Sequence, residues 1–307
     1  MSKQINTAHI IGLGAIGGTY ASIMTKHNKA SLKVIVDARR KALLAEKGLT
    51  VNGTRHDFDY ICPEEADKAA ELILIAVKAH QLDEAIAAIK PFAGRNTVIM
   101  SLLNGISSEE TIARSMDTGK ILHAFCVGID ALKEGQSIRY STAGKIVFGD
   151  KDHNKAAELE AVRSFFDKTG LPYQIPNDIM REMWWKFLMN IGFNQTSAIL
   201  RAPYGVYKNV KEIRELMFDA ASEVLPLAKK EGINLTESDI QGYFDIIDKF
   251  LPDGKTSMLQ DVEAGRKTEV ESFALAVMEL GKKHHIPTPV NAVLYKMIRV
   301  IEQNYPK

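Results

Sequence analysis

The sequence feature that most constrains the fold is a glycine-rich turn close to the N-terminus. An apolar run at residues 8–13 leads into Gly12-Leu13-Gly14-Ala15-Ile16-Gly17, and a helical pattern at 15–27 follows. In a GxGxxG turn between a strand and a helix, the first glycine permits the tight turn, the second lets the backbone approach a pyrophosphate, and the third lets helix and strand pack closely. The helix start also offers free N–H groups to phosphates. We therefore predict a dinucleotide site with these cofactor-binding residues: Gly12, Gly14, Ala15, Ile16 and Gly17.

After this turn, short apolar runs alternate with helical patterns. This alternation predicts βαβ units and a parallel sheet. The predicted strands lie at 32–36, 72–77 and 97–103, and the helices at 38–47 and 82–89. Shorter β-like runs at 121–148, a helix at 156–169 and a last strand at 173–175 complete this part.

From Asp178 onward the sequence shows only helical patterns. The predicted helices lie at 179–200, 210–231, 237–250, from Ser257, at 269–284 and at 289–304. We place a domain boundary near Pro176-Asn177. The expected fold class is therefore α/β, with an N-terminal Rossmann-type parallel-sheet domain (1–177) followed by an all-α C-terminal domain (178–307).

The bulk properties exclude several classes of protein. The formal net charge of +1 gives no basic field for nucleic acid, and 46% hydrophobic residues are typical of a globular chain. The most apolar run, at 72–77, is too short to cross a membrane, and the short polar start does not resemble a signal peptide. The two cysteines, Cys62 and Cys126, form no CxxC pair, which argues against a disulfide framework or metal site. We expect a soluble cytoplasmic protein without nucleic-acid or membrane partners.

The residues after the second predicted strand give conflicting indications about the dinucleotide. Asp37 has the spacing of an acid that accepts a hydrogen bond from the ribose 2′-OH of NAD. Arg39 and Arg40 follow directly and are suited to the 2′-phosphate of NADP, or simply to a solvated helix start. The choice between NAD and NADP stays open at this point.

Two polar residues follow the next predicted strands. Lys78 comes after the strand at 72–77, and Asn104 after the strand at 97–103. Ligands of open parallel sheets bind beyond the carboxyl ends of the strands. We therefore expect Lys78 to reach cofactor phosphate or ribose, and Asn104 to meet the nicotinamide ribose or the substrate.

A polar stripe interrupts the apolar helix predicted at 179–200. Lys186, Asn190 and Asn194 lie at i, i+4 and i+8, within an arc of roughly 80° on one helix face. Because large apolar residues flank the stripe, its ammonium and amides need partners or a ligand. Such a stripe suits ketone reduction, since an ammonium stabilises and protonates the oxygen as hydride adds to the carbonyl carbon.

Together these motifs resemble the ketopantoate reductase (2-dehydropantoate 2-reductase) family. The resemblance runs in order over nearly the whole chain. It rests on the GxGxxG turn, Val77-Lys78-Ala79, Leu103-Asn104-Gly105, Trp185-Lys186-Phe187 with Asn190 and Asn194, and Ser257-Met258-Leu259-Gln260-Asp261 with Thr268-Glu269.

The resemblance implies an NADPH-dependent reductase of ketopantoate in pantothenate and coenzyme A biosynthesis. Lys186 is then the general acid and Glu269 its catalytic partner. The implied substrate-binding residues are Asn104, Asn190, Asn194 and Ser257. Lys78 is an implied NADP contact, and NAD(H) stays possible because of Asp37.

Helix geometry adds one expectation for the last motif. Ser257 and Glu269 would be about 18 Å apart on a continuous helix, too far to serve one small substrate. We predict that Thr256 or Ser257 caps a helix, that the chain breaks around Gly265-Arg266-Lys267, and that a new helix starts at Thr268 or Glu269.

Two departures keep alternatives open. Tyr204 stands where members of the family often have a third asparagine, and Asp37 is not usual for an NADPH enzyme. One alternative is a related reductase of another 2-oxo or 3-hydroxy acid. Another is a dinucleotide sensor without turnover, against which the presence of Lys186 and Glu269 argues. The apolar helices of the second domain also suggest a homodimer.

Overall fold

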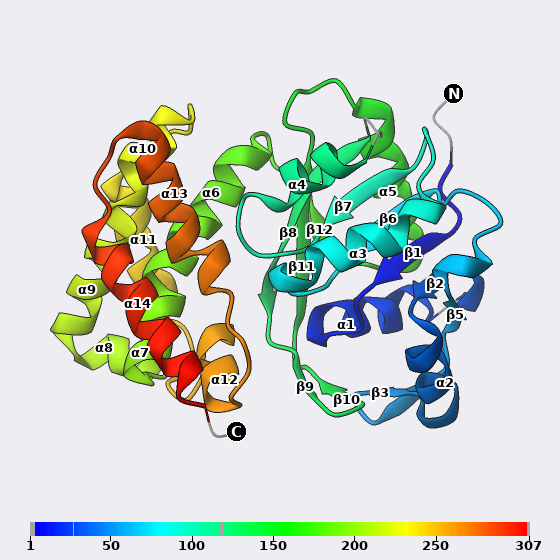
Figure 1. The fold of residues 1–307 in the computed structure, drawn as a ribbon, viewed down its shortest axis with the longest axis horizontal. Coiled ribbons are helices and arrows are strands. Elements are labelled where there is room, and N and C mark those ends of the chain that lie inside the picture. The colour runs from blue at the N-terminus through cyan, green and yellow to red at the C-terminus, as the bar shows by residue number, and fades with distance from the viewer. Residues whose placement is uncertain (1–3, 27, 117–119, 306–307) are drawn as a thin grey trace. The chain divides into compact units, whose positions relative to one another are not determined.

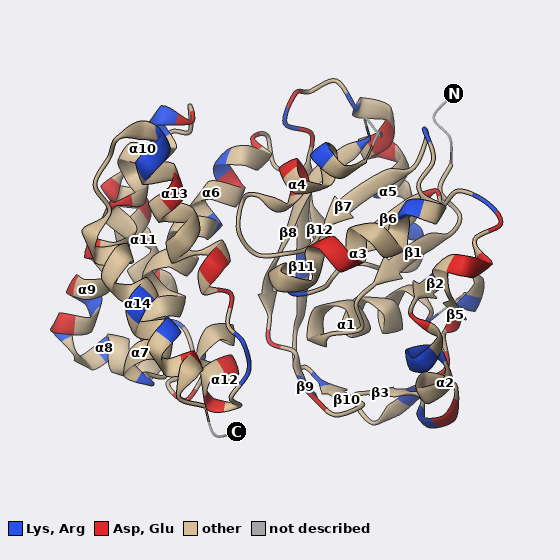
Figure 2. Cartoon of the chain, in the orientation of Figure 1, with Lys and Arg blue, Asp and Glu red and all other residues tan. Residues whose placement is uncertain are grey.

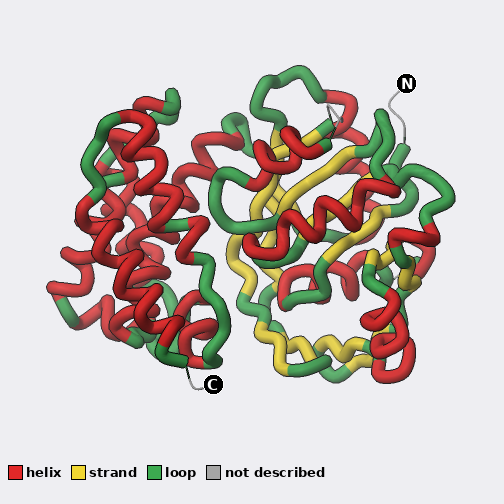
Figure 3. The backbone as a smooth tube through the Cα atoms, in the orientation of Figure 1, coloured by secondary structure: helices red, strands yellow, loops and turns green. Residues whose placement is uncertain are grey.

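The computed structural model describes residues 4–26, 28–116 and 120–305. The chain divides into two compact units between Ile179 and Met180, two residues after the boundary expected from the sequence. Figure 3 shows that the strands belong to the first unit and that helices build the second. The α/β class predicted from the sequence is confirmed.

The first unit is built on an eight-stranded sheet (Figure 1). Its strands, in spatial order, are β12 (Tyr173–Gln174), β11 (Ala143–Gly149), β8 (Ile121–Ile129), β7 (Val98–Ser101), β6 (Leu72–Ile75), β1 (Ala8–Ile11), β2 (Leu32–Ile35) and β5 (Asp59–Ile61). All neighbouring pairs are parallel except β8 and β11, which are antiparallel. The predicted parallel sheet is therefore confirmed.

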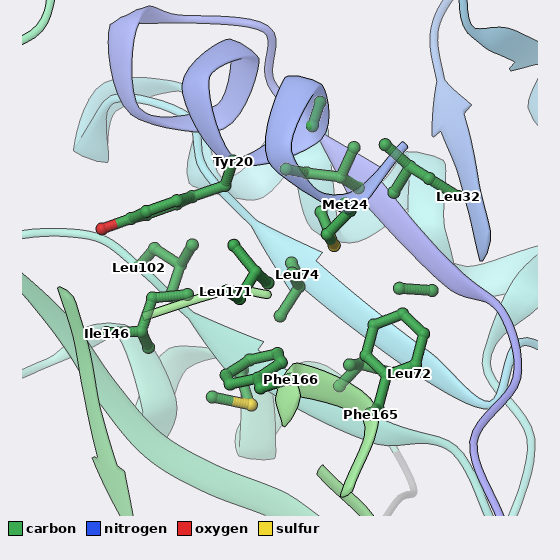
Figure 4. Close-up of a cluster of buried hydrophobic side chains, with 14 of the residues drawn as sticks. Tyr20, Met24, Leu32, Leu72, Leu74, Leu102, Ile146, Phe165, Phe166 and Leu171 are labelled. Atoms are coloured by element: carbon green, nitrogen blue, oxygen red, sulfur yellow. The ribbon is translucent and has the colours of Figure 1, made fainter. Parts of the chain in front are cut away.

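Helices cover both faces of this sheet because its central strands are apolar on both sides. Along β6, Leu72 and Leu74 join one buried cluster, whereas Ile73 and Ile75 join another. The first cluster, part of which Figure 4 shows, includes residues of α1 (Ala15–Met24), α2 (Ala38–Lys47) and α5 (Ala156–Thr169). The second includes residues of α3 (Leu82–Ile89) and α4 (Ser108–Ser115). Figure 2 shows β1, β6 and β7 without charged residues, as burial on both faces requires.

A second, four-stranded sheet in this unit was not predicted. Its order is β4 (Thr54–His56), β3 (Leu49–Val51), β10 (Ser137–Arg139) and β9 (Leu132–Glu134). Each strand has only three residues, so none produces a long alternating pattern. The sheet packs on α1, where a Cβ added to Gly18 would lie 2.3 Å from Ile138 Cδ1.

The second unit is all helical. Its helices are α6 (Ile179–Met189), α7 (Gln195–Leu200), α8 (Tyr204–Asn209), α9 (Lys211–Ser222), α10 (Val224–Lys230), α11 (Glu237–Ile247), α12 (Ser257–Glu263), α13 (Ala274–His284) and α14 (Pro289–Gln303). Its core contains the buried side chains of Phe187, Met217, Leu227, Val277 and Leu294. In the described ranges no helix is both long and apolar enough to cross a membrane.

Two long helices predicted from the sequence are in fact interrupted. The helix predicted at 179–200 contains a π-helical turn, Asn190–Asn194, where Gly192 lies so close to α9 that a Cβ would be 2.8 Å from the Met217 carbonyl oxygen. The helix predicted at 210–231 ends first at Ser222, because Pro226 has no N–H to donate to the Ser222 carbonyl. The first predicted helix, 15–27, ends at Met24, and His27 lies outside the described residues.

Candidate functional site

The sheet brings the candidate cofactor residues of the first unit to one edge. Ile11, Ile35, Ile75 and Ser101 are in register at the carboxyl ends of β1, β2, β6 and β7. The segments that leave this edge carry the glycine turn, Asp37, Lys78 and Asn104, respectively. The chain reverses its direction of strand addition at β1, which makes this edge the usual ligand position of an open α/β sheet.

The three glycines of the turn differ in how much room the surrounding atoms leave for a side chain. Gly12 has a φ of +97°, and a Cβ would lie 2.5 Å from the Ala76 carbonyl oxygen. A Cβ on Gly17 would lie 1.9 Å from the Gly12 carbonyl oxygen. At Gly14 the nearest atom, again the Ala76 oxygen, would be 3.8 Å away, so the protein itself leaves room for a side chain. The bare backbone at Gly14 fits close approach of a ligand, which is the role of the second glycine in dinucleotide turns.

The acidic residue after β2 caps a helix. Asp37 is the N-cap of α2, and its Oδ1 accepts a hydrogen bond from the Arg40 N–H at 2.7 Å. The side chains of Asp37, Arg39 and Arg40 are all exposed. One carboxylate oxygen of Asp37 therefore already accepts a hydrogen bond from the protein itself. The cationic residues Arg39 and Arg40 follow it closely in the sequence.

Lys78 and Asn104 lie farther from the strands than predicted. β6 ends at Ile75 and β7 at Ser101, so both residues belong to the connecting segments. Lys78 is the N-cap of a 3₁₀ turn, and its backbone N–H donates to Gln81 Oε1 at 3.3 Å. Both side chains are half-buried at the same sheet edge.

In the helical unit, the π-helical turn holds two of the predicted substrate residues together. Asn194 Nδ2 donates a hydrogen bond to Asn190 Oδ1 at 3.3 Å, and Asn194 is 8% exposed. Asn190 Nδ2 is buried and has no hydrogen-bond partner among the described residues. A buried donor left without an acceptor costs about 1–3 kcal/mol. The free N–H groups are therefore suited to an oxygen atom of a ligand.

The π turn also explains how the amides share one side of the helix. In a regular α-helix, residues four apart drift by roughly 40° around the axis. A π turn takes up more residues per turn and so counteracts this drift between Asn190 and Asn194. Lys186, in the last turn of α6 just before the π turn, is half-buried.

The chain break predicted between Ser257 and Glu269 is confirmed. Thr256 is the N-cap of α12, with its Oγ1 accepting from the Leu259 N–H at 3.1 Å, and Ser257 is the exposed first residue of the helix. α12 ends at Glu263, and Gly265 takes a φ of +62°. Glu269, 6% exposed, is the N-cap of a short 3₁₀ turn instead of an α-helix. The pairing of Lys186 with Glu269 stays a prediction.

Tyr204 contacts the segment that precedes α12 through both its hydroxyl and its ring. Its hydroxyl donates to the Lys255 carbonyl at 2.9 Å, and its ring packs against Phe193 and Phe250 with centroids 5.3 and 4.9 Å away. Burial raises the pKa of Tyr204 to about 12, so the hydroxyl stays a neutral donor. α12 in turn packs against the π turn. Tyr204 thus links the segment before Ser257 to the helix that carries Asn190 and Asn194, called here the amide-bearing helix.

Sequence reasoning missed two charged residues of the first unit. Glu109, at the start of α4, is 4% exposed, and burial raises the pKa of its carboxyl to about 7. Lys133, on β9, donates from Nζ to the Leu13 carbonyl inside the glycine turn at 2.6 Å. Because Lys133 and Leu13 are 120 positions apart, no local sequence signal indicates this contact.

The comparisons with known proteins agree in both parts of the chain. Residues 8–153 match the family described as ketopantoate reductase PanE/ApbA, and residues 178–302 match the C-terminal part of the same family. Fold and matches define the class as an NAD(P)-dependent oxidoreductase. The chain belongs to the ketopantoate reductase PanE/ApbA family.

Similar proteins cover nearly the whole chain. The 2-dehydropantoate 2-reductase of Aquifex aeolicus is 28% identical over 95% of this chain and 96% of its own length. That of Archaeoglobus fulgidus is also 28% identical, over 97% and 99%. In fold, the chain resembles a dimeric ketopantoate reductase from Staphylococcus aureus (TM-score 0.83, 24% identity, 98% and 100% covered). It also resembles a D-mandelate dehydrogenase with NADH and anilino(oxo)acetate (TM-score 0.88, 21% identity, 97% and 99% covered).

Proposed function

We propose that this protein reduces 2-dehydropantoate (ketopantoate) to pantoate with NAD(P)H, in the biosynthesis of pantothenate and coenzyme A. The observation that carries the proposal is the buried amide of Asn190, whose Nδ2 has no acceptor among the described residues. Its neighbour Asn194 orients it through the 3.3 Å hydrogen bond. A preorganised donor of this kind suits a polar substrate with several oxygen atoms. The family to which the chain belongs supplies the reaction class.

In the proposed mechanism Lys186 is the general acid. When bound, NAD(P)H supplies the hydride that reduces the C2 carbonyl carbon. The Lys186 ammonium stabilises the negative charge that develops on the carbonyl oxygen and gives it the proton. Glu269 keeps this lysine charged and oriented. Asn104, Asn190, Asn194 and Ser257 bind the substrate, with Ser257 at its carboxylate.

We assign cofactor binding to residues 1–177 and substrate binding to residues 178–307, with Asn104 of the first part also contacting the substrate. The backbone at Gly12, Gly14, Ala15, Ile16 and Gly17 holds the pyrophosphate, where the α1 N-terminus favours anions. Lys78 and Asn104 contact the cofactor from the segments that follow β6 and β7. NADP(H) is the proposed cofactor, because Arg39 accompanies an Asp37 already engaged as a helix cap.

A second candidate is a reductase of another 2-oxo or 3-hydroxy acid. The observation that favours it is the hydrogen bond from the Tyr204 hydroxyl to the Lys255 carbonyl. This bond occupies the hydroxyl at a position where the family resemblance leads us to expect a substrate-binding asparagine. A substrate without pantoate's hydroxyl needs no such contact.

The test is to follow the loss of reduced-cofactor absorbance with ketopantoate and with a panel of 2-oxo acids, using NADPH and NADH in parallel. We expect turnover of ketopantoate by the native protein and a loss of at least about 100-fold in kcat for Lys186→Ala. The matched control is Lys296→Ala, which removes an exposed lysine of α14 in the same unit. Turnover of another 2-oxo acid but not of ketopantoate establishes the second candidate. Dinucleotide binding without any turnover contradicts both.

We further propose a homodimer in a reducing, cytoplasmic compartment. The support for a dimer is an apolar stripe on α14, where Val293, Met297 and Val300 are exposed at helical spacing, and the similar S. aureus enzyme is dimeric. The support for the compartment is that Cys62 and Cys126 are both buried thiols. Light scattering of the native protein and of Met297→Asp tests the dimer, which the charge should weaken.

A further inference from the structure

The turn that carries Glu269 is bound by a carboxylate of α14. Glu302 lies in the last turn of this helix, and its Oε1 accepts two hydrogen bonds from Thr268, one from the backbone N–H at 2.8 Å and one from the hydroxyl at 2.7 Å. The other oxygen, Oε2, accepts from Arg299 Nη1 at 2.7 Å. Because Thr268 directly precedes Glu269, Glu302 binds the chain next to the proposed partner of Lys186.

The bonds to Thr268 fix the backbone on both sides of Glu269. The Thr268 hydroxyl, which donates to Glu302, also accepts from the Val270 N–H at 3.3 Å. Val270 is fully buried and opens the 3₁₀ turn that Glu269 caps. The residues before and after Glu269 are thus connected to one side chain of α14, and the backbone they define sets the direction of the Glu269 side chain.

The stretch of chain before this turn lies at the surface. Residues 263–267 are all exposed, and Thr268, 2% exposed, is the first buried residue after them. The ion pair between Lys267 and Glu271, at 3.0 Å, joins side chains that are 43% and 39% exposed, and such pairs contribute little to stability. The position of Glu269 therefore depends on how Thr268 is bound where the chain returns to the core.

The place of Glu302 on its own helix is unfavourable for a carboxylate. The last turn of a helix has the negative end of the helix dipole, where cations are stabilising and anions are not. The Glu302 side chain is also only 8% exposed, and burial of a charge costs free energy unless the charge is paired and hydrogen-bonded. Two hydrogen bonds from Thr268 and one from Arg299 offset these costs. The contact with Thr268 thus accounts for a glutamate here, whereas the stability of α14 alone does not.

We propose that Glu302 is a positioning residue for the reaction: by accepting both hydrogen bonds from Thr268, it directs Glu269 toward the Lys186 ammonium. The inference rests on the proposed function, in which Glu269 keeps Lys186 charged and oriented. Glu302 contacts neither substrate nor cofactor in this role. Displacement of a catalytic group by about 1 Å can cost about 100-fold in rate, so an anchor away from the reacting atoms affects turnover. The role does not depend on which 2-oxo acid is reduced.

The test is steady-state kinetics of Glu302 variants with ketopantoate and saturating NADPH, after thermal unfolding has shown that each variant is folded. Glu302→Leu removes the acceptor and should lower kcat by at least about 10-fold, with the KM for ketopantoate within about 3-fold of native. Glu302→Gln keeps a carbonyl oxygen for Thr268 and should retain kcat within about 3-fold. Glu279→Leu, which removes an exposed carboxylate of α13, is the matched control.

A double-mutant cycle separates the positioning of Glu269 from a general role in folding. Glu269→Gln removes the carboxylate that Glu302 positions, so the addition of Glu302→Leu to this variant should lower kcat by less than about 2-fold further. If Glu302→Leu lowers kcat by the same factor in both backgrounds, or leaves kcat unchanged in the native background, the inference is overturned and the proposed function is not.

Variants of Thr268 give the answer if Glu302→Leu does not fold. Thr268→Val keeps the shape of the side chain but removes the hydroxyl that donates to Glu302, whereas Thr268→Ser retains a hydroxyl. We expect kcat to fall by at least about 3-fold in Thr268→Val and to stay within about 2-fold of native in Thr268→Ser. Equal kcat values in the two variants overturn the inference. A native protein that binds a dinucleotide but reduces no 2-oxo acid overturns the proposed function and the inference with it.

Discussion

The hydroxyl of Tyr204 donates a hydrogen bond to the carbonyl of Lys255, at 2.9 Å, two residues before Ser257. The backbone supports the same connection, because the Tyr204 N–H donates to the Gly254 carbonyl at 2.9 Å. Tyr204 therefore holds the segment that leads into α12 from the side of the amide-bearing helix. We therefore expect Tyr204 to position Ser257, the proposed carboxylate-binding residue, and not to contact the substrate itself.

Tyr204→Phe should raise the KM for the 2-oxo acid by about 5- to 10-fold and change kcat by less than about 2-fold. The reason is that the Lys255 carbonyl loses its donor and the segment before Ser257 becomes less ordered. Steady-state kinetics at saturating NADPH measures both constants. Tyr204→Asn should in addition lower the free energy of unfolding by about 3 kcal/mol, because it leaves a cavity between Phe193 and Phe250. A native KM in Tyr204→Phe contradicts the positioning role.

Local patterns were sufficient to predict the regular elements. The helices 82–89 and 156–169 have the bounds expected from their apolar spacing. The π turn at Asn190–Asn194 could not be predicted, because it occurs where Gly192 lies close to α9, a tertiary contact that leaves no local pattern. The small sheet depends in the same way on pairing between β3 and β10, which are far apart in the sequence.

The candidate site could be predicted where its side chains follow the end of a strand or lie on one face of a helix. The glycine turn, Asp37, Lys78 and Asn104 reach one sheet edge because the register of parallel strands aligns their carboxyl ends. Lys133 and Glu109 were missed because their importance comes from burial and from tertiary contacts. A lysine in a hairpin and a glutamate at a helix start are usually solvated.

Two glycine substitutions should separate folding from cofactor binding. Gly17→Ala places a Cβ 1.9 Å from the Gly12 carbonyl oxygen and should lower the free energy of unfolding by about 3 kcal/mol. Gly14→Ala meets only an ordinary contact at 3.8 Å, so the unfolding temperature should stay near native while NADPH affinity falls by at least about 10-fold. Thermal unfolding and calorimetry of both variants measure this. Native NADPH affinity in Gly14→Ala would place the dinucleotide elsewhere.

The buried carboxyl of Glu109 should make stability fall as pH rises. Burial raises its pKa from 4.5 to about 7, so between these values the folded chain binds more protons than the unfolded chain. His9 and His123 act in the opposite sense. Burial lowers the pKa of each from 6.5 to about 4, and their contribution is lost as pH falls through this range.

Glu109→Gln isolates the carboxyl from the histidines. The variant should gain stability relative to the native protein as pH rises from 4.5 to 7, by at most about 3 kcal/mol, because its amide does not ionise. Urea unfolding at several pH values measures the difference. Glu110→Gln, an exposed neighbour, is the control. A difference that does not depend on pH would mean that Glu109 titrates alike in both states.

We expect the buried amides of Asn190 and Asn194 to be needed for turnover but not for the stability of the fold. Asn190→Leu/Asn194→Leu removes a buried donor that has no acceptor among the described residues, so the free energy of unfolding should stay the same or rise by about 1 kcal/mol. The same double variant should lose about 100-fold in kcat/KM for the 2-oxo acid, with NADPH affinity unchanged.

Asn291→Leu, in the same unit, should have the opposite effects on stability and turnover. Asn291 is fully buried and bonded to Gln195, Ala220 and Glu223, so its removal should cost about 3 kcal/mol of stability without a direct effect on turnover. Thermal unfolding and steady-state kinetics of both variants distinguish the two kinds of buried amide. If the double variant instead loses stability and keeps its turnover, the Asn190 and Asn194 amides serve the fold and the substrate is bound elsewhere.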